Sequence, residues 1–114
     1  MKIFVVSMSH PHGEGWNIHL IPHLEYLQKL IAEGTLLASG PLKGTELRTG
    51  FLVIKAESRE AVEAIVAGDP FAIEDLIVTL TIEEWDPLFG AFAAESSKTF
   101  AALSDDEASR FIKA

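Results

Sequence analysis

Residues 35–56 read TLLASGPLKGTELRTGFLVIKA, and they contain two strand patterns that follow each other directly. The first pattern covers 35–39 and is predicted to end at the Gly40-Pro41 pair. The second covers 49–56 and is rich in the aromatic and β-branched residues that strands favour. This pair of consecutive strands lies between two helical patterns, and it therefore fixes the order of the elements around it.

The flanking segments add one strand and one helix on each side. A strand over 2–9 precedes a helix that reaches Glu33, and a second helix after Ser58 precedes a last strand over 76–85. The resulting order, β-α-β-β-α-β, is the ferredoxin-like arrangement of the α+β class. It predicts a four-stranded antiparallel sheet with both helices on one face.

Boundary residues and apolar faces refine this outline. Proline is favoured at the first helical position, so the regular part of the first helix is expected to begin near Pro22, and Gly34 is expected to end it. The face of this helix predicted to be buried consists of Leu20, Leu24, Leu27 and Ile31. Ser58 is the predicted N-cap of the second helix, which ends at Gly68 and turns Ala61, Val62, Ile65 and Val66 inward. The last strand is predicted to place Leu76, Val78, Leu80 and Ile82 on one face.

The first strand is apolar on both of its faces. Ile3 and Val5 belong to one face, and Phe4 and Val6 belong to the other. Helices can cover only one side of such a sheet, so the second apolar face needs another cover. The sequence therefore predicts a homodimer that is joined sheet to sheet, or a larger homo-oligomer built from such pairs.

The predicted domain covers residues 1–87, and residues 88–114 form a C-terminal tail. The tail is not a solvated linker, because it carries Phe89, Phe92, Phe100 and Leu103. Ser104 and Glu107 have capping-box spacing, which predicts a short helix over 105–113. This helical tail is expected to pack on its own domain or on the partner chain.

Composition excludes several classes of protein. The chain has 114 residues, 48% of them hydrophobic and 23% charged, which is typical of one globular domain. With no cysteine, disulfides and thiol chemistry are excluded.

The net charge is −8, and residues 56–114 carry thirteen acidic against four basic side chains. Such a surface repels phosphate, so neither nucleic acid nor a phospholipid membrane is an expected partner. No signal or membrane-spanning run is apparent, and we expect a cytoplasmic protein whose partners are small molecules and other protein chains.

His23 and Asp69 are the candidate catalytic pair. His23 borders the apolar face of the first helix, and a place in its first turn would favour the neutral imidazole that a general base needs. Asp69 precedes Pro70, which keeps it out of the helical conformation. Adjacent helices in this fold can bring the two side chains together. Each residue also has a plain structural interpretation: a partly buried histidine bonded to a carbonyl, and the aspartate of an Asp-Pro turn.

Two other groups of residues have spacings that can carry chemistry. The histidines at 10, 12, 19 and 23 have spacings that are compatible with a divalent metal site, but only Glu14 offers a nearby carboxylate. The glycines at 40, 44 and 50 match neither the dinucleotide-binding nor the P-loop pattern. Ser39 lacks the surroundings of a nucleophilic serine. We therefore predict neither a metal ion nor a cofactor.

Three segments together resemble one family. They are residues 23–34 (HLEYLQKLIAEG), 36–41 (LLASGP) and 69–71 (DPF) before the last strand, and they are similar to the YCII-related (YciI-like) family. The resemblance implies a dimeric α+β barrel fold, close to muconolactone isomerase-like proteins, and a His-Asp pair that corresponds to His23 and Asp69. The family includes a dehydrochlorinase of a chlorinated hydroxyquinol. Many members carry an arginine a few residues before the histidine, where this chain has His19 and Leu20.

The resulting hypothesis is a small apolar pocket between the first helix and the sheet. His23 would act as general acid and base and Asp69 would orient it, for isomerisation, elimination or dehydrochlorination of a small cyclic or enolic compound. The residues expected to bind the substrate are His10, His12, Ser39, Gly40, Pro41 and Phe71. The alternatives are a non-catalytic module for ligand binding or assembly, and a histidine-rich metal-binding protein.

Overall fold

The computed structural model of this chain describes residues 1–97, 106, 109 and 110. Its elements follow the predicted order, with a short third helix and a 3₁₀ turn in addition. In chain order they are β1 (Lys2–His10), α1 (Gly15–Ala32), β2 (Leu36–Leu42), β3 (Arg48–Ala56), α2 (Arg59–Ala67), α3 (Pro70–Ile73), β4 (Thr79–Trp85) and the 3₁₀ turn η1 (Ala93–Glu95).

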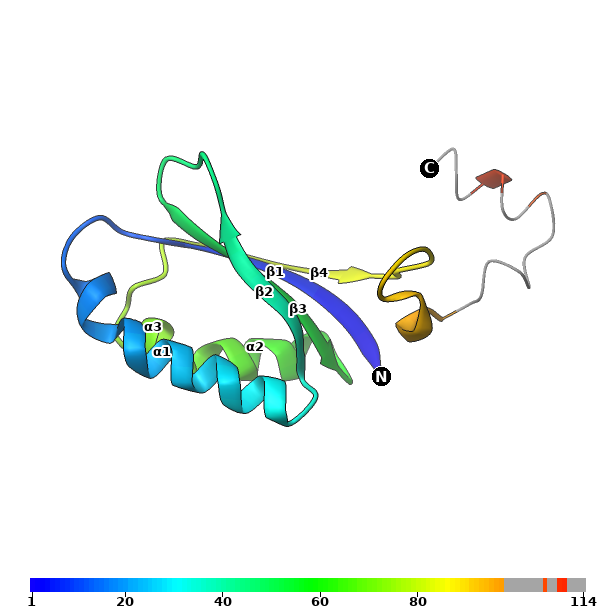
Figure 1. Ribbon diagram of the computed structural model, residues 1–114, viewed down its shortest axis with the longest axis horizontal. Helices are drawn as coiled ribbons and strands as arrows, with labels where there is room; N and C mark the ends of the chain where they lie inside the picture. The colour runs from blue at the N-terminus through cyan, green and yellow to red at the C-terminus, as the bar shows by residue number, and fades with distance from the viewer. Residues whose placement is uncertain (98–105, 107–108, 111–114) are drawn as a thin grey trace.

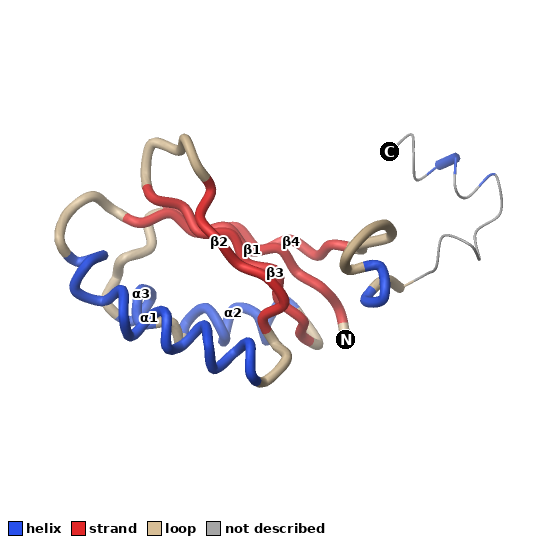
Figure 2. The backbone as a smooth tube through the Cα atoms, viewed as in Figure 1, coloured by secondary structure: helices blue, strands red, loops and turns tan. Residues whose placement is uncertain are grey.

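One antiparallel sheet holds all four strands in the order β2-β3-β1-β4. The three helices cover a single face of this sheet, which leaves two layers (Figure 1). Figure 2 shows the same separation, with the helices on one side of the strands. The ferredoxin-like α+β prediction is therefore confirmed. None of the helices in the described part of the chain is long and apolar enough to cross a bilayer.

The core lies between the sheet and α2, with the end of α1 beside it. Alternate residues of β1 and β3 point toward the helices, because successive side chains in a strand face opposite sides. The buried strand residues form one cluster with Leu30 of α1 and with Val62 and Val66 of α2. The strand residues in this cluster are Phe4, Val6, Met8, Leu36, Leu52, Ile54, Ala56 and Ile82.

Local capping signals set two helix ends where the sequence predicts them. The Ser58 hydroxyl accepts a hydrogen bond from the Ala61 amide at 3.1 Å and caps α2. Gly34 has a φ of 77°, a left-handed conformation that costs glycine little, and it follows the end of α1. The Thr35 amide then donates to the Leu30 carbonyl at 2.9 Å, which closes the helix end.

The expected start of α1 is wrong, because the helix begins at Gly15 and contains Pro22. Pro22 has no amide hydrogen to donate to the Ile18 carbonyl. Ile18 is 66% exposed, so water reaches this side of the helix and the missing bond is tolerated. Consequently His23 lies near the middle of α1, and the helix dipole at the first turn does not control its charge.

The predicted end of the second strand at Ser39 is also wrong. β2 continues to Leu42, and Gly40 and Pro41 pair with Phe51 and Gly50 of β3. β2 is an edge strand, where a proline can be accommodated because one side of the strand needs no amide donor.

The last strand starts at Thr79, three residues later than predicted. The α3 helix and the link that follows it occupy the preceding residues. Of the four residues expected to share a face, Ile82 is buried, whereas Val78 and Leu80 are 53% and 42% exposed. The alternation of apolar residues at 76–82 therefore overstated both the length and the burial of β4.

The second face of the sheet is partly covered by the chain that follows β4. Ile3 is buried at 2% exposure on this face, and Lys55 beside it pairs with Glu95 at 2.8 Å. The Phe92 ring makes an edge-on contact with Trp85, with a centroid distance of 6.1 Å. Phe92 and Glu95 of the segment after β4 thus contact strand residues. The predicted tail helix over 105–113 falls outside the described residues except at three positions.

Candidate active site

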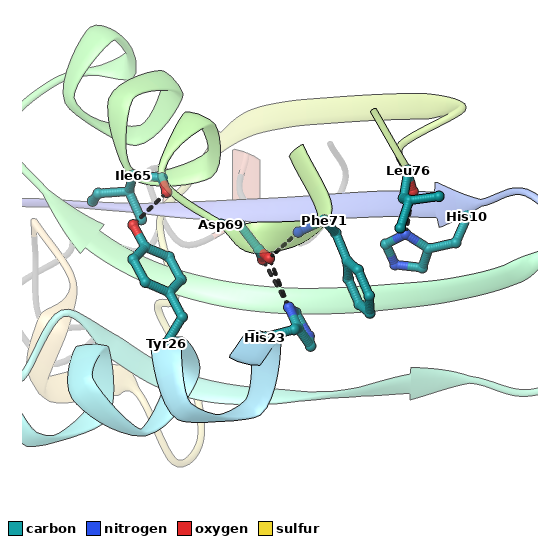
Figure 3. A network of polar contacts seen from close by, with 7 residues as sticks. All are labelled: His10, His23, Tyr26, Ile65, Asp69, Phe71 and Leu76. Atoms are coloured by element: carbon teal, nitrogen blue, oxygen red, sulfur yellow. Dashed lines mark hydrogen bonds and ion pairs between the residues drawn. The ribbon is translucent and has the colours of Figure 1, made fainter. Parts of the chain in front are cut away.

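An imidazole and a carboxylate meet between α1 and the start of α3 (Figure 3). His23 Nδ1 lies 2.9 Å from each of the two Asp69 oxygens. The His23 side chain is 12% exposed, and Asp69 is 1% exposed. The structure therefore brings together, across 46 positions of sequence, the two residues expected to form a pair.

The position of Asp69 follows from Pro70. A residue before proline is driven to extended conformations, and Asp69 has φ −69° and ψ 132°. Pro70 then begins α3, and the Asp69 carboxylate caps that helix by accepting from the Phe71 amide at 2.9 Å. Asp69 is therefore both the residue of an Asp-Pro turn and the partner of His23. For Asp69, the structural interpretation and the catalytic interpretation are therefore compatible.

The contact with Asp69 fixes the protonation geometry of the imidazole. An ionised carboxylate only accepts hydrogen bonds, so the hydrogen of neutral His23 resides on Nδ1. Within the described part of the chain, no hydrogen bond reaches the other ring nitrogen, Nε2. The side chain consequently offers the lone pair of Nε2 as an acceptor for a proton.

Phe71 packs between two imidazoles, as Figure 3 shows. Its ring stacks on His23 with a centroid distance of 4.2 Å and lies 4.6 Å from the ring of His10. Phe71 is 1% exposed, so its position is fixed by packing. The aromatic ring restricts the rotation of both histidines and holds them at one end of the sheet.

His10 is a second buried imidazole with a different partner. Its Nδ1 donates to the Leu76 carbonyl at 2.7 Å, and the residue is 4% exposed. Burial lowers the pKa of His10 below its usual value, and the carbonyl contact opposes this shift only in part. Repulsion by the protonated form of His23 also lowers the pKa of His10, whereas Asp69 raises it. His10 is therefore neutral at pH 7 and presents Nε2 as an acceptor.

The lowered pKa of His10 predicts a pH dependence of stability. Folding disfavours the protonated form, so this contribution to the free energy of unfolding is complete above about pH 6.5 and is lost as the pH falls below it. His10→Asn keeps a donor for the Leu76 carbonyl but removes the titrating ring. Urea unfolding at about pH 7.5 and about pH 5.5 should show a larger loss of stability in the wild type than in this variant.

The matched control for this measurement is His12→Asn, at an exposed position of the neighbouring loop. It should reproduce the wild-type loss of stability. Equal losses in the wild type and in His10→Asn would show that burial of His10 does not shift its titration.

His23 and His10 both line a cavity of about 610 Å³ between α1 and the sheet. Ser39, Gly40, Pro41 and Phe71 line it as well, so five of the six expected binding residues lie there, whereas His12 does not. The wall is mainly apolar and includes Leu20, Leu24, Leu27 and Ile31. The expectation that this face of α1 is buried is therefore wrong, since Leu24 and Ile31 are 42% and 56% exposed and form the wall of the cavity.

Two residues at the cavity were missed by the sequence argument. Arg48 and Trp16 both line it, and the Arg48 guanidinium lies over the Trp16 ring at 4.0 Å from its centroid. His12 instead lines a smaller neighbouring cavity of about 330 Å³, which Arg48 also borders. In the strand register Arg48 lies opposite His10. No local signal in the sequence marks Arg48, because its place at the cavity follows from the pairing of β1 with β3.

The four histidines do not gather around one point. His10 and His23 line the larger cavity, His12 lines the smaller one, and His19 lies 3.9 Å from Glu74. Within residues 1–97, 106, 109 and 110, no group of three or more histidine or acidic side chains has the geometry to hold a metal ion.

Comparison with known proteins identifies a family and a similar fold. A family model described as the YCII-related domain matches residues 6–86. Among solved structures, a similar fold is that of 5-chloro-2-hydroxyhydroquinone dehydrochlorinase from Burkholderia phenoliruptrix AC1100, in complex with 2,5-dihydroxybenzoquinone. The TM-score is 0.63 at 26% sequence identity, and the match covers 74% of this chain and 93% of the other. No curated protein matches the sequence.

Proposed function

This chain belongs to the YCII-related domain family. We propose that it is an enzyme that acts on a small molecule, in which His23 transfers a proton and Asp69 holds the His23 ring in position. The observation that supports this most is the contact of His23 Nδ1 with both Asp69 oxygens at 2.9 Å, beside a cavity of about 610 Å³. A buried carboxylate that fixes one ring nitrogen leaves the other free for acid–base chemistry.

The proposed reaction begins with removal of an acidic proton from the substrate. His23 Nε2 accepts that proton from a carbon next to a carbonyl. The electrons of the broken C–H bond form a C=C bond, and the carbonyl π electrons move to the oxygen, which gives an enolate. Asp69 balances the charge of the imidazolium that forms. In an isomerisation, the imidazolium returns the proton to another atom of the same system. In an elimination, the enolate electrons form a C=C bond to the neighbouring carbon as the bond from that carbon to a leaving group such as chloride breaks. Chloride departs as the anion, and the imidazolium later releases the proton to solvent.

Two observations favour a small cyclic or enolic substrate. The cavity wall is apolar over the α1 face and aromatic at Phe71 and Trp16, which suits a planar ring. The similar structure is a dehydrochlorinase of a chlorinated hydroquinone. On this proposal, Phe71 packs against the ring, and Ser39, Gly40 and Pro41 of β2 form the opposite wall.

The competing interpretation is a non-catalytic module in which His23 and Asp69 only hold α1 to α3. The structure favours catalysis over this interpretation through one feature: His23 lines a cavity and has a ring nitrogen that no described residue binds. A purely structural pair needs neither a cavity nor a free nitrogen.

A turnover assay with the full chain tests the proposal. A panel of small cyclic ketones, enols and chlorinated hydroquinones, including 5-chloro-2-hydroxyhydroquinone, is incubated in D₂O. Deuterium uptake is followed by NMR, and chloride release is followed with an electrode. The wild-type protein should accelerate one of these processes by more than about 100-fold over buffer. Rates equal to those in buffer for the whole panel would contradict the acid–base function.

We propose further that two copies pair through the second face of the sheet. An apolar groove of about 500 Å³ on this face is lined by Val5, Ala38, Ser39, Phe51, Val53, Trp85 and Phe92.

Light scattering should give about twice the mass of 12.4 kDa. Phe51→Asp should give a monomer, because it places a charge in the groove. Ile73→Asp, at an exposed position outside the groove, is the control and should remain a dimer. A monomeric wild type at about 100 μM would contradict the pairing.

A further inference from the structure

Arg48 lines the same cavity as His23. It begins β3 and lies opposite His10 in the register of the sheet, so it belongs to the end of the sheet where the two histidines lie. Its guanidinium lies over the Trp16 ring at 4.0 Å, and such a contact fixes a flexible side chain in place. Trp16 in turn stacks on Phe71, which connects Arg48 through aromatic rings to His23.

The charge of Arg48 is not balanced by an ion pair within the described part of the chain. Lys2, Lys55 and Arg59 each form an ion pair with a glutamate there, at 3.8, 2.8 and 3.2 Å. No such contact joins Arg48 to a described carboxylate. The guanidinium donors are therefore available to a ligand, apart from the face that covers Trp16.

The remaining wall of the cavity makes this cation distinctive. Arg48 is the only lysine or arginine among the described residues that line it, and no aspartate or glutamate lines it. The whole chain has a net charge of −8, so its overall field repels anions. A cation at the cavity offsets this repulsion locally and favours an anionic group of a ligand there.

We propose that this cavity takes a planar ring compound that carries a carboxylate or an ionised ring oxygen, and that the Arg48 guanidinium binds this anionic group. The proposal names the substrate class of the acid–base function proposed above and rests on it, although its test needs no turnover. A guanidinium offers paired donors in a plane, which match a carboxylate or two neighbouring ring oxygens. With the anion at Arg48, the ring of the ligand lies beside Phe71 and is directed toward His23.

Glu46 is the group that most directly competes with this role. It lines the smaller neighbouring cavity, as Arg48 does. A glutamate that approached the guanidinium in solution would reduce its affinity for an anionic ligand. Glu46→Gln therefore belongs in the test and should bind anions at least as tightly as the wild type.

The test compares benzoate with benzamide, two rings of nearly equal shape that differ in charge. Their dissociation constants are measured by calorimetry on the full chain at low and at physiological salt. The wild type should bind benzoate at least about tenfold more tightly than benzamide, as expected for a charge-assisted pair. The preference should decrease as salt is added.

Arg48→Met should lower the affinity for benzoate by about 10-fold to 100-fold and leave the affinity for benzamide nearly unchanged. The matched control is Lys43→Met, which removes an equal charge from the same hairpin at a residue that lines neither cavity. It should keep the preference for benzoate. Arg48 is exposed, so the melting temperature of Arg48→Met should stay close to that of the wild type.

Three results would overturn the proposal. In the first, the wild type binds no benzoate up to about 10 mM. In the second, Arg48→Met keeps the preference for benzoate. In the third, Lys43→Met loses as much affinity for benzoate as Arg48→Met does. His23→Asn separates this proposal from the acid–base function, because it should keep the preference for benzoate. Loss of turnover in that variant bears only on the acid–base function.

Discussion

His23→Asn is expected to lower kcat by about 100-fold to 10,000-fold while the protein stays folded. Asparagine keeps an N–H donor near the position of Nδ1, so the contact with Asp69 can persist at a similar place. It has no counterpart of Nε2, which is the atom proposed to accept the proton. The effect should fall on kcat more than on KM, because the proposed role of His23 is in the reaction step.

The control for this variant is His19→Asn, one turn earlier on α1. His19 pairs with Glu74 at 3.9 Å and does not line the cavity. It should leave kcat within about threefold of the wild type. If His23→Asn keeps wild-type turnover and only loses thermal stability, the pair is a structural contact and the acid–base function is wrong.

Asp69→Asn is expected to lower kcat by a similar factor for a different reason. The remaining amide oxygen can still accept from the Phe71 amide, so the cap of α3 is retained. The amide nitrogen, however, is a donor, and in the orientation that faces His23 it places a donor toward Nδ1. That arrangement favours the tautomer with hydrogen on Nε2, which cannot accept a proton from the substrate.

Asp69→Ala provides the comparison for stability. It removes the cap as well as the partner of His23, so it should lower the free energy of unfolding by about 1 kcal/mol more than Asp69→Asn. The double variant of Asp69→Asn and His23→Asn should have the same kcat as His23→Asn alone, because Asp69 is proposed to act only through His23. Additive losses of kcat would mean that Asp69 has an independent role in the reaction.

The sequence predicted the fold because its signals are local. The β-branched run of β3, the Ser58 cap and Gly34 each act within a few residues, and each is observed where expected. Pro22 was misinterpreted because its preferred position at a helix start is only a tendency. An exposed helix face can tolerate a missing hydrogen bond, and the sequence does not show which turn faces water.

The site was predicted only in part, because its remaining features depend on tertiary geometry. Helical periodicity indicates that one face of α1 is apolar, but it cannot distinguish a packed face from the wall of a cavity. Leu24 and Ile31 belong to such a wall. Arg48 and Trp16 meet because the pairing of β1 with β3 brings the loop after His10 close to the start of β3. Neither residue carries a motif that would reveal this contact.

The central claim is that His23 directs a hydrogen on Nδ1 to Asp69 and presents an unprotonated Nε2 to the cavity. Nitrogen NMR of the imidazoles in the full chain at about pH 8 measures this arrangement directly. We expect two histidines, His10 and His23, to carry hydrogen on Nδ1 with a free Nε2. Only the signal that vanishes in His23→Asn should change in Asp69→Asn, whereas the signal that vanishes in His10→Asn should stay. A His23 that carries its hydrogen on Nε2 in the wild type would contradict the account.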